Sequence, residues 1–254
     1  MDRNEAVLRE LNLYPLWQRR GAPASDSVQK TVPAEASPEV AGVTAMPGEA
    51  PITAQDAVAP MSAASLDWPE LKQQVRDCIA CKLRAGCTQT VFGVGDEQAE
   101  WLFVGEGPGA DEDAQGEPFV GQAGKLLDNM LLAIKLKRGK NVYIANIVKC
   151  RPPNNRAPER DEIATCLSYL QRQIALIKPK LIVALGKTAA TALLGREATL
   201  GSLRGTLHDF NGVPLIVTYH PAYLLRSPME KAKAWQDLCF ATDAMRKEDK
   251  EVNC

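Results

Sequence analysis

Four short apolar segments of the chain have the length and composition of buried β-strands. They lie near residues 101–104, 141–148, 180–186 and 214–220. The segments between and after them repeat apolar residues at helical spacing, as in Leu127, Met130, Leu131 and Ile134. Strands that alternate with helices predict an α/β fold, in which helices cover both faces of a mostly parallel sheet.

The first 64 residues show a different pattern. Residues 1–21 predict a short amphipathic helix, ended by Pro15, with Trp17 and two arginines after it. Residues 22–64 contain six prolines among Ala, Ser, Val and Glu, which predicts a disordered linker. We expect the folded domain to cover residues 65–254. The N-terminal helix either docks onto a partner protein or packs on its own domain.

Composition places the chain among ordinary globular proteins. It has 254 residues, 45% hydrophobic and 24% charged, with a formal net charge of −1. No apolar run reaches the roughly 18 residues of a membrane span, and no secretory signal follows Met1. We expect a cytoplasmic monomer without membrane contact. Residues 1–64 carry 5 Lys and Arg against 8 Asp and Glu, which leaves 25 against 23 in the remainder. A nucleic-acid site must therefore be a local patch.

A glycine-rich loop follows the first predicted strand. Its glycines permit a tight turn and close approach to a bound group: Gly105, Gly107 and Gly109. An acidic run comes next: Asp111, Glu112 and Asp113. Ligands of open α/β sheets bind beyond the carboxyl ends of the strands. We therefore expect a pocket for a flat, neutral ring here, with Phe119 as its stacking face.

Other interpretations of this loop fit less well. A dinucleotide-binding loop needs a helix that begins at once, and the acidic run would repel its phosphates. A phosphate-binding P-loop is disfavoured by the short spacing from Gly121 to Lys125 and by Leu126 in place of Ser or Thr. A plain surface turn is the remaining alternative.

Four of the seven cysteines have a spacing typical of metal ligands. Cys78 and Cys81 form a C-x-x-C pair, and Cys166 follows Cys150 after 15 intervening residues. Four thiolates bind either tetrahedral zinc or an iron–sulfur cluster, and the spacing does not separate the two. A lone C-x-x-C pair is also typical of redox motifs. Cys87 is a rival ligand with looser spacing, and we expect it to be a bystander.

Four motifs occur together in this chain: GEGPGADED from residue 105, PFVGQAG from residue 118, YIANIVKCRPP from residue 143 and HPAYLLR from residue 220. With them the chain resembles the iron–sulfur uracil-DNA glycosylases, family 4 of that superfamily, over roughly residues 70–245. The resemblance implies a three-layer α/β/α sandwich around a four-stranded sheet. It implies a [4Fe-4S] cluster on Cys78, Cys81, Cys150 and Cys166, and excision of uracil from single- or double-stranded DNA in base excision repair. With this function, the partner expected for residues 1–21 is a replication or repair protein.

The resemblance also gives roles to single residues. An extruded uracil would stack on Phe119. Asn146 would recognise its N3–H and O4, which mismatch the amino group of cytosine. His220 would donate an N–H to uracil O2 as negative charge develops there. Three further residues would line the pocket: Gly105, Glu106 and Gly107.

The group that activates water is less clear from the sequence. The best-known relatives have an Asp where this chain has Gly107, so Glu106 is the nearest carboxylate. We expect a dissociative route, in which water captures an oxocarbenium-like sugar with little help from a base. Glu106 would have a supporting catalytic role.

The segment after His220 is the predicted DNA contact. Leu224 and Leu225 would wedge into the base stack, and Arg226 would meet a phosphate. Three more cations near the predicted cluster are candidates for backbone contacts: Lys149, Arg151 and Arg156.

Two other functions fit parts of the sequence. A non-catalytic iron–sulfur module for DNA binding or electron transfer needs the cysteines, but not Phe119, Asn146 and His220 together. A related glycosylase could act on another damaged base or bond covalently to the abasic product. Gly107 and the absence of a histidine after the second-strand motif argue against the covalent variant.

Overall fold

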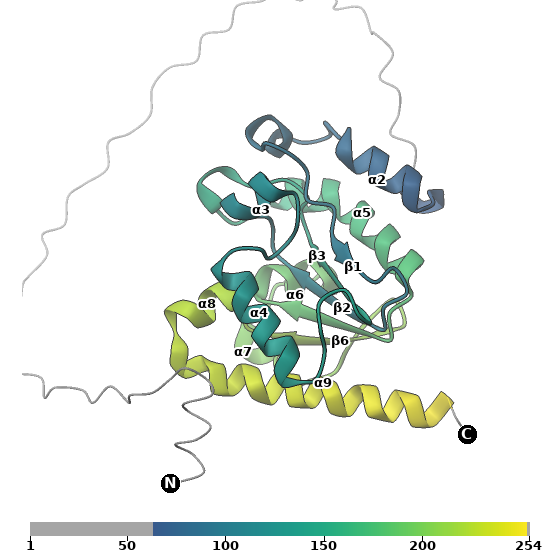
Figure 1. Cartoon of the computed structure of the whole chain (residues 1–254), viewed down its shortest axis with the longest axis vertical. Helices are drawn as coiled ribbons and strands as arrows, with labels where there is room; N and C mark the ends of the chain where they lie inside the picture. Colours follow the sequence, from purple (N-terminus) through teal and green to yellow (C-terminus); the bar gives the residue numbers. More distant parts are fainter. Residues whose placement is uncertain (1–62, 253–254) are drawn as a thin grey trace, which may run out of the picture. The chain divides into compact units, whose positions relative to one another are not determined.

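A six-stranded sheet runs through residues 63–252, the part of the chain that the computed structural model describes (Figure 1). The strand order is β1-β3-β2-β4-β6-β5. The strands are β1 (Val94–Gly95), β2 (Trp101–Gly105), β3 (Val142–Asn146), β4 (Leu181–Leu185), β5 (His208–Phe210) and β6 (Val213–Thr218). The predicted N-terminal helix, and all but the last two residues of the predicted linker, lie outside the described residues.

The four predicted strands form the centre of this sheet. Strands β3, β2, β4 and β6 are all parallel, whereas β1 and β5 pair antiparallel at the two edges. The sheet therefore has two more strands than the four expected. Strands of two and three residues are too short to give a detectable alternation of polar and apolar residues, so the sequence did not predict them.

Helices cover both faces of the sheet, which confirms the α/β/α sandwich. Successive side chains of a strand point to opposite faces. Leu102 and Val104 pack toward α2 (Trp68–Arg76), α5 (Arg160–Ile177), α6 (Lys187–Leu194) and α7 (Leu200–Leu203). Trp101 and Phe103 pack toward α4 (Gln122–Ala133) and α9 (Lys231–Val252). No helix within residues 63–252 combines the length and apolar character needed to cross a membrane.

Local sequence signals explain where several helices begin. Asp67 and Glu70 form a reciprocal capping box at the start of α2, where Pro69 also lies. The acidic run after Gly109 differs from expectation, because it forms the first turn of a short helix, α3 (Ala110–Gln115), rather than a loop. Carboxylates are favourable in that turn because they oppose the positive end of the helix dipole.

The remaining helices are short. They are α8 (Pro221–Arg226) and four 3₁₀ turns, η1 (Ala63–Ser65), η2 (Lys82–Gly86), η3 (Pro153–Asn155) and η4 (Pro228–Glu230). Helix α8 contacts α4, and Leu224 packs with Met130, Ala234 and Leu238 of α4 and α9. This packing fixes the segment that follows His220.

Candidate active site at the carboxyl ends of the strands

Side chains from separate segments meet where the parallel strands end. Gly105 ends β2 and lies in register with Asn146, which ends β3. His220 follows β6 by two residues, and Phe119 lies between α3 and α4. We call Gly105, Phe119, Asn146 and His220 the strand-end cluster.

The distances within the strand-end cluster are short. A Cβ atom built on Gly105 would lie 2.5 Å from Oδ1 of Asn146 and 2.5 Å from Cζ of Phe119. The rings of Phe119 and His220 have centroids 5.5 Å apart and are tilted by 31°. The structure thus brings together the three side chains that the sequence proposed for one base.

Asn146 presents an unpartnered acceptor. Its side chain is 2% exposed, and Oδ1 has no hydrogen-bond partner within the described part of the chain. Leaving a buried acceptor unpaired costs about 1–3 kcal/mol, so such an atom calls for an explanation. The position of Oδ1 beside Phe119 suits a ligand that donates an N–H from the edge of a ring.

His220 is arranged as a neutral donor. Its Nδ1 accepts the backbone N–H of Ala222 at 3.2 Å, so the proton of the neutral ring lies on Nε2. Burial lowers the pKa of His220 to about 4, and the nearby positive charge of Arg226 acts in the same direction. The imidazole is therefore uncharged at neutral pH and can still donate from Nε2.

One carboxylate, Glu112, closes the loop around Phe119. It accepts the backbone N–H groups of Val120 at 3.0 Å, Gly121 at 3.1 Å and Gly109 at 3.0 Å. From the sequence, Glu112 is only a secondary candidate, after Glu106, for the acid that activates water, and its role in this loop was not predicted. Its position three residues after Gly109 is the spacing of a capping-box acid, which was the available signal.

Glu106 is held by a residue from another strand–helix unit. Its Oε2 accepts the hydroxyl hydrogen bond of Thr188, at the start of α6. The next residue, Gly107, has no room for a side chain, because a Cβ there would lie 2.8 Å from Cγ2 of Val148. An Asp at position 107 would clash with this neighbour, which leaves Glu106 as the carboxylate at this point of the loop.

Two predicted DNA contacts need correction. Leu224 is 1% exposed and packs in the core, because it lies on the face of α8 that turns toward α4 and α9. Leu225, the next residue, is 43% exposed, and Arg226 is also exposed.

The second correction concerns Lys149, which is 1% exposed and therefore not available to a DNA phosphate. Its ammonium group donates to the backbone oxygen of Asn146 at 3.0 Å and to Gln173 at 2.6 Å.

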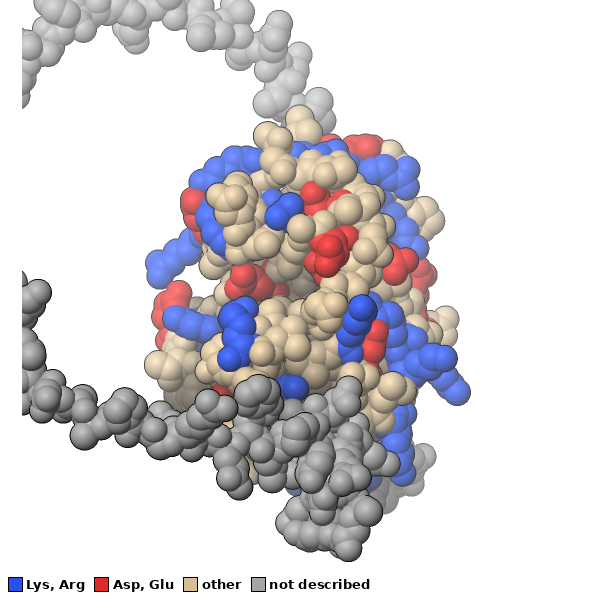
Figure 2. Space-filling model, turned by 60° about the vertical axis from the view of Figure 1, so that its left-hand side comes forward, with Lys and Arg blue, Asp and Glu red and all other residues tan. Residues whose placement is uncertain are grey.

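Charges on one side of the domain are mixed in sign. Figure 2 shows Lys and Arg interspersed with Asp and Glu around a recess, on the side of the domain that carries α3 and α8. Of the other predicted backbone contacts, Arg156 is committed to an ion pair with the buried Glu162, whereas Arg151 is partly exposed.

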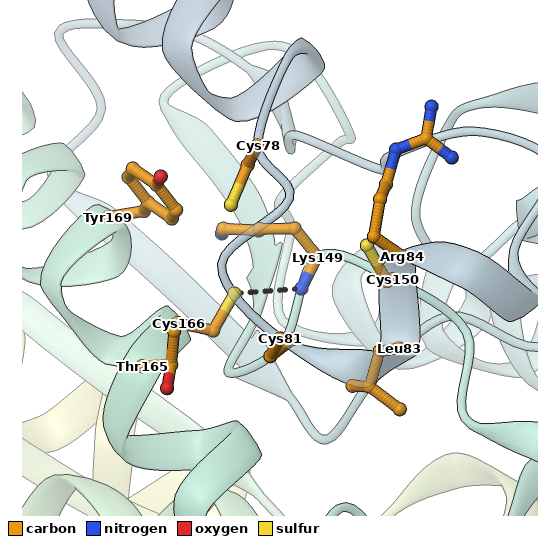
Figure 3. Close-up of a pocket in the computed structure, with 9 residues that line it drawn as sticks. All are labelled: Cys78, Cys81, Leu83, Arg84, Lys149, Cys150, Thr165, Cys166 and Tyr169. Carbon is orange, nitrogen blue, oxygen red and sulfur yellow. Dashed lines mark hydrogen bonds between the residues drawn. The ribbon is translucent and has the colours of Figure 1, made fainter. Parts of the chain in front are cut away.

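The four predicted cysteine ligands line one small cavity (Figure 3). Cys78 and Cys81 come from the segment after α2, Cys150 from the loop after β3 and Cys166 from α5. The backbone N–H of Lys149 donates to Sγ of Cys166 at 3.3 Å. Within residues 63–252, no three His, Cys, Asp or Glu side chains lie close enough to share a single metal ion.

Four sulfur donors around one cavity are a ligand set for a [4Fe-4S] cluster or for tetrahedral zinc, so the thiols present fit either group. Cys87 does not line the cavity. Burial and the neighbouring Cys87 thiol both raise the pKa of Cys150.

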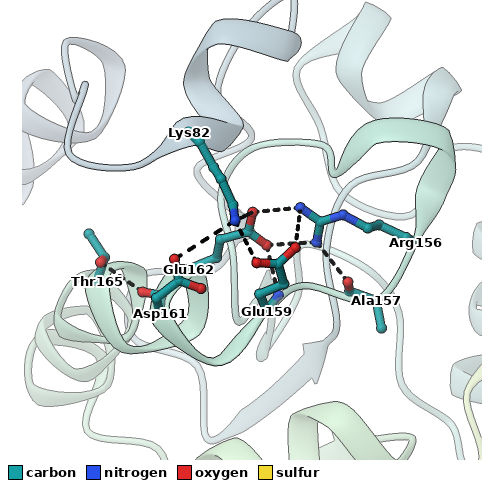
Figure 4. Close-up of polar contacts among 7 residues, drawn as sticks. All are labelled: Lys82, Arg156, Ala157, Glu159, Asp161, Glu162 and Thr165. Carbon is teal, nitrogen blue, oxygen red and sulfur yellow. Dashed lines mark hydrogen bonds and ion pairs between the residues drawn. The ribbon is translucent and has the colours of Figure 1, made fainter. Parts of the chain in front are cut away.

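A charged network joins the segments that carry these cysteines (Figure 4). Arg156 binds the fully buried carboxylate of Glu162 through two hydrogen bonds of 2.8 and 2.7 Å. Arg156 also lowers the pKa of Glu162. Lys82, directly after Cys81, pairs with Glu159 and lies 3.9 Å from Glu162. The network therefore links η2 to the start of α5.

The fold is an α/β/α sandwich with the strand-end cluster at the carboxyl ends of its parallel strands. Comparison with known proteins then identifies its family. The model of the uracil DNA glycosylase superfamily matches residues 92–239. That match covers more than half of the chain, so the chain belongs to the uracil DNA glycosylase superfamily.

Individual relatives support this assignment. A type-4 uracil-DNA glycosylase of Pyrobaculum aerophilum is 42% identical over 183 residues, which cover 69% of this chain and 93% of that protein. The type-4 enzyme of Archaeoglobus fulgidus is 44% identical over 65% of this chain and 85% of its own. A type-5 uracil-DNA glycosylase of Pyrobaculum aerophilum is 31% identical over 51% and 64%, respectively. These relatives give no support to a non-catalytic iron–sulfur module.

Proposed function

We propose that this protein is a uracil-DNA glycosylase of base excision repair, which extrudes uracil from DNA and hydrolyses its N-glycosidic bond. The observation that carries the proposal is the buried, unpartnered Oδ1 of Asn146 beside Phe119 and His220, in a chain of this superfamily. A base inside a duplex is inaccessible, so the enzyme acts on a flipped nucleotide.

The strand-end cluster recognises the base by shape and by hydrogen bonds. The ring of Phe119 stacks on the pyrimidine. Oδ1 of Asn146 accepts N3–H of uracil, and the amide nitrogen donates to O4. Cytosine has an acceptor at N3 and an amino group at C4, so both contacts become repulsive. Gly105 forms the floor, because any larger residue would fill the space between Phe119 and Asn146.

His220 stabilises the departing base. As the bond from C1′ of the sugar to N1 of uracil breaks, its electron pair stays on uracil and the negative charge spreads to O2. Nε2–H of the neutral imidazole donates to that oxygen. A donor of this kind contributes about 3–4 kcal/mol to the transition state. Water adds to C1′, its proton leaves to solvent, and solvent protonates the uracil anion.

Glu106 has the supporting role in this dissociative route. The Thr188 hydroxyl orients its Oε2, and the carboxylate can hold the incoming water on the sugar side. Gly107 has no side chain that could activate water. Stabilisation of the departing base therefore accounts for most of the reduction in the activation barrier. The products are free uracil and an abasic site.

A [4Fe-4S] cluster fits Cys78, Cys81, Cys150 and Cys166, as the set of four thiols around one cavity suggests. When bound, it would cross-link the segment after α2, the loop after β3 and α5, and no step of excision is assigned to it.

The exposed end of α8 contacts the DNA. Leu225 wedges into the stack that the base leaves, and Arg226 meets a phosphate.

The decisive experiment measures release of uracil from a single-stranded oligonucleotide with one uracil, and compares two histidine variants. His220→Gln should lower kcat by about two to three decades. His208→Gln is the matched control, because His208 lies on edge strand β5, away from the strand-end cluster, where its side chain bonds to Leu203 and Arg196. It should keep wild-type activity. A wild-type protein that carries its metal cofactor and releases no uracil would refute the proposal.

A further inference from the structure

Phe119 has a backbone conformation that its residue type disfavours. Its φ is +57°, in the left-handed region that side chains other than Gly, Asn and Asp rarely adopt. Such a conformation persists only where the surroundings determine it, and it is found preferentially at functional sites. Contacts with the surrounding fold must therefore stabilise this backbone conformation of Phe119.

Arg138 makes contacts that restrain this conformation directly. Its Nη1 donates to the carbonyl oxygen of Pro118 at 2.8 Å, and its Nη2 donates to the carbonyl oxygen of Phe119 at 2.8 Å. These two carbonyls belong to the peptide planes on either side of the Phe119 Cα, and φ and ψ of Phe119 set the angle between the planes. A rigid guanidinium that binds both oxygens therefore fixes both dihedral angles.

The guanidinium is itself held in place. Its Nε donates to Oδ1 of Asp128 in α4 at 3.0 Å, so all three nitrogens are used. Arg138 is only 22% exposed. The carbonyl of Phe119 also presses against the first turn of α4, where a Cβ on Gly124 would lie 1.8 Å from its oxygen. The arginine and the glycine act on the same carbonyl from different elements.

We propose that Arg138 is a positioning residue for base recognition: it holds the two carbonyls around Phe119 so that the ring faces Asn146 and His220. Arg138 acts only through Phe119. The inference rests on the proposed function, in which Phe119 stacks on uracil. Without the two hydrogen bonds from the Arg138 guanidinium, the backbone of Phe119 relaxes to negative φ and the ring leaves the strand-end cluster.

A double-mutant cycle tests this role. The four proteins are wild type, Arg138→Met, Phe119→Ala and the double variant, each assayed for kcat/KM on a uracil oligonucleotide and for the Kd of free uracil. Arg138→Met should lower kcat/KM by about 10- to 100-fold and weaken binding of uracil, as misplacement by about 1 Å does. In the Phe119→Ala background the same substitution should change kcat/KM by less than about twofold.

Three variants separate positioning from a loss of fold. Arg138→Lys should be more active than Arg138→Met but less active than wild type. An ammonium group can bind either carbonyl oxygen, but it lacks the planar pair of donors that binds both in a fixed geometry. Asp128→Asn keeps both carbonyl contacts and should cost less than about threefold. Arg172→Met removes another arginine that bonds a backbone carbonyl, that of Leu66, and should lower stability without a selective effect on uracil binding.

The outcomes distinguish the two proposals. If wild type releases uracil and Arg138→Met matches it, the positioning role is wrong. It is also wrong if Arg138→Met costs as much in the Phe119→Ala background as in wild type, because the arginine then acts independently of the ring. Failure of the wild-type protein to release uracil overturns the proposed function instead.

Discussion

Gly105→Ala is the smallest change that tests the geometry of the strand-end cluster. The added Cβ would lie 2.5 Å from Oδ1 of Asn146, and 2.5 and 2.7 Å from Cζ and Cε2 of Phe119. Non-bonded carbon atoms are comfortable at about 3.5–4.0 Å, so the ring and the amide must each retreat by roughly 1 Å. Both displaced groups are those that the proposed function places on uracil.

Gly105→Ala should lower activity strongly while most of the protein stays folded. A misplacement of about 1 Å costs about 100-fold in rate. Overpacking by one methyl group costs about 1–3 kcal/mol of unfolding free energy. For a protein of this size, each kcal/mol lowers Tm by about 2–4 °C, so most of the protein stays folded at assay temperature.

The assay compares kcat/KM for uracil release with the thermal melt of the same preparations. Gly201→Ala in α7 is the matched control, because a Cβ there meets no atom within 4 Å. It should leave kcat/KM unchanged and should not lower Tm, because Ala is favoured over Gly within a helix. Wild-type kcat/KM in Gly105→Ala would show that Phe119 and Asn146 do not act on the base as a unit, and the reasoning would fail.

Three further predictions address other parts of the site. Because the pKa of His220 lies near 4 in the folded protein and near 6.5 when unfolded, the unfolded chain binds more protons between these values. The free energy of unfolding should thus fall by up to about 3 kcal/mol as the pH drops from 6.5 to 4. Urea titrations of His220→Gln should lack this part of the pH dependence. An equal fall in the variant would contradict a neutral His220. Leu225→Ala should slow excision more from duplex than from single-stranded DNA, whereas equal losses would count against the wedge. Glu106→Gln should retain measurable uracil release, and complete loss with intact uracil binding would point to a carboxylate base.

The cysteine site is open to a direct spectroscopic check. The purified protein should absorb near about 400 nm, as thiolate-bound iron–sulfur clusters do. Cys78→Ser should remove this band, whereas Cys87→Ser should preserve it, because Cys87 does not line the cavity. A band that persists without Cys78 and vanishes without Cys87 would reassign the ligands.

The framework of the fold follows from local patterns of residues. Short apolar runs specify the four central strands, and the capping residues Asp67 and Glu70 mark the start of α2. These are short-range signals, because strand pattern and helix capping depend on residues within a few positions of one another. The same locality explains why the two edge strands escaped prediction, since they are too short to carry a pattern.

Which side chains lie together depends on the packing of distant segments. Leu224 and Leu225 are neighbours in sequence, but α8 buries one in the core and exposes the other. Lys149 reads as a surface cation, yet its ammonium group lies inside the fold against Gln173. Arg138 reaches back 19 positions to Phe119. Contacts of this kind depend on how helices pack on the sheet, and no local pattern of residues encodes that packing.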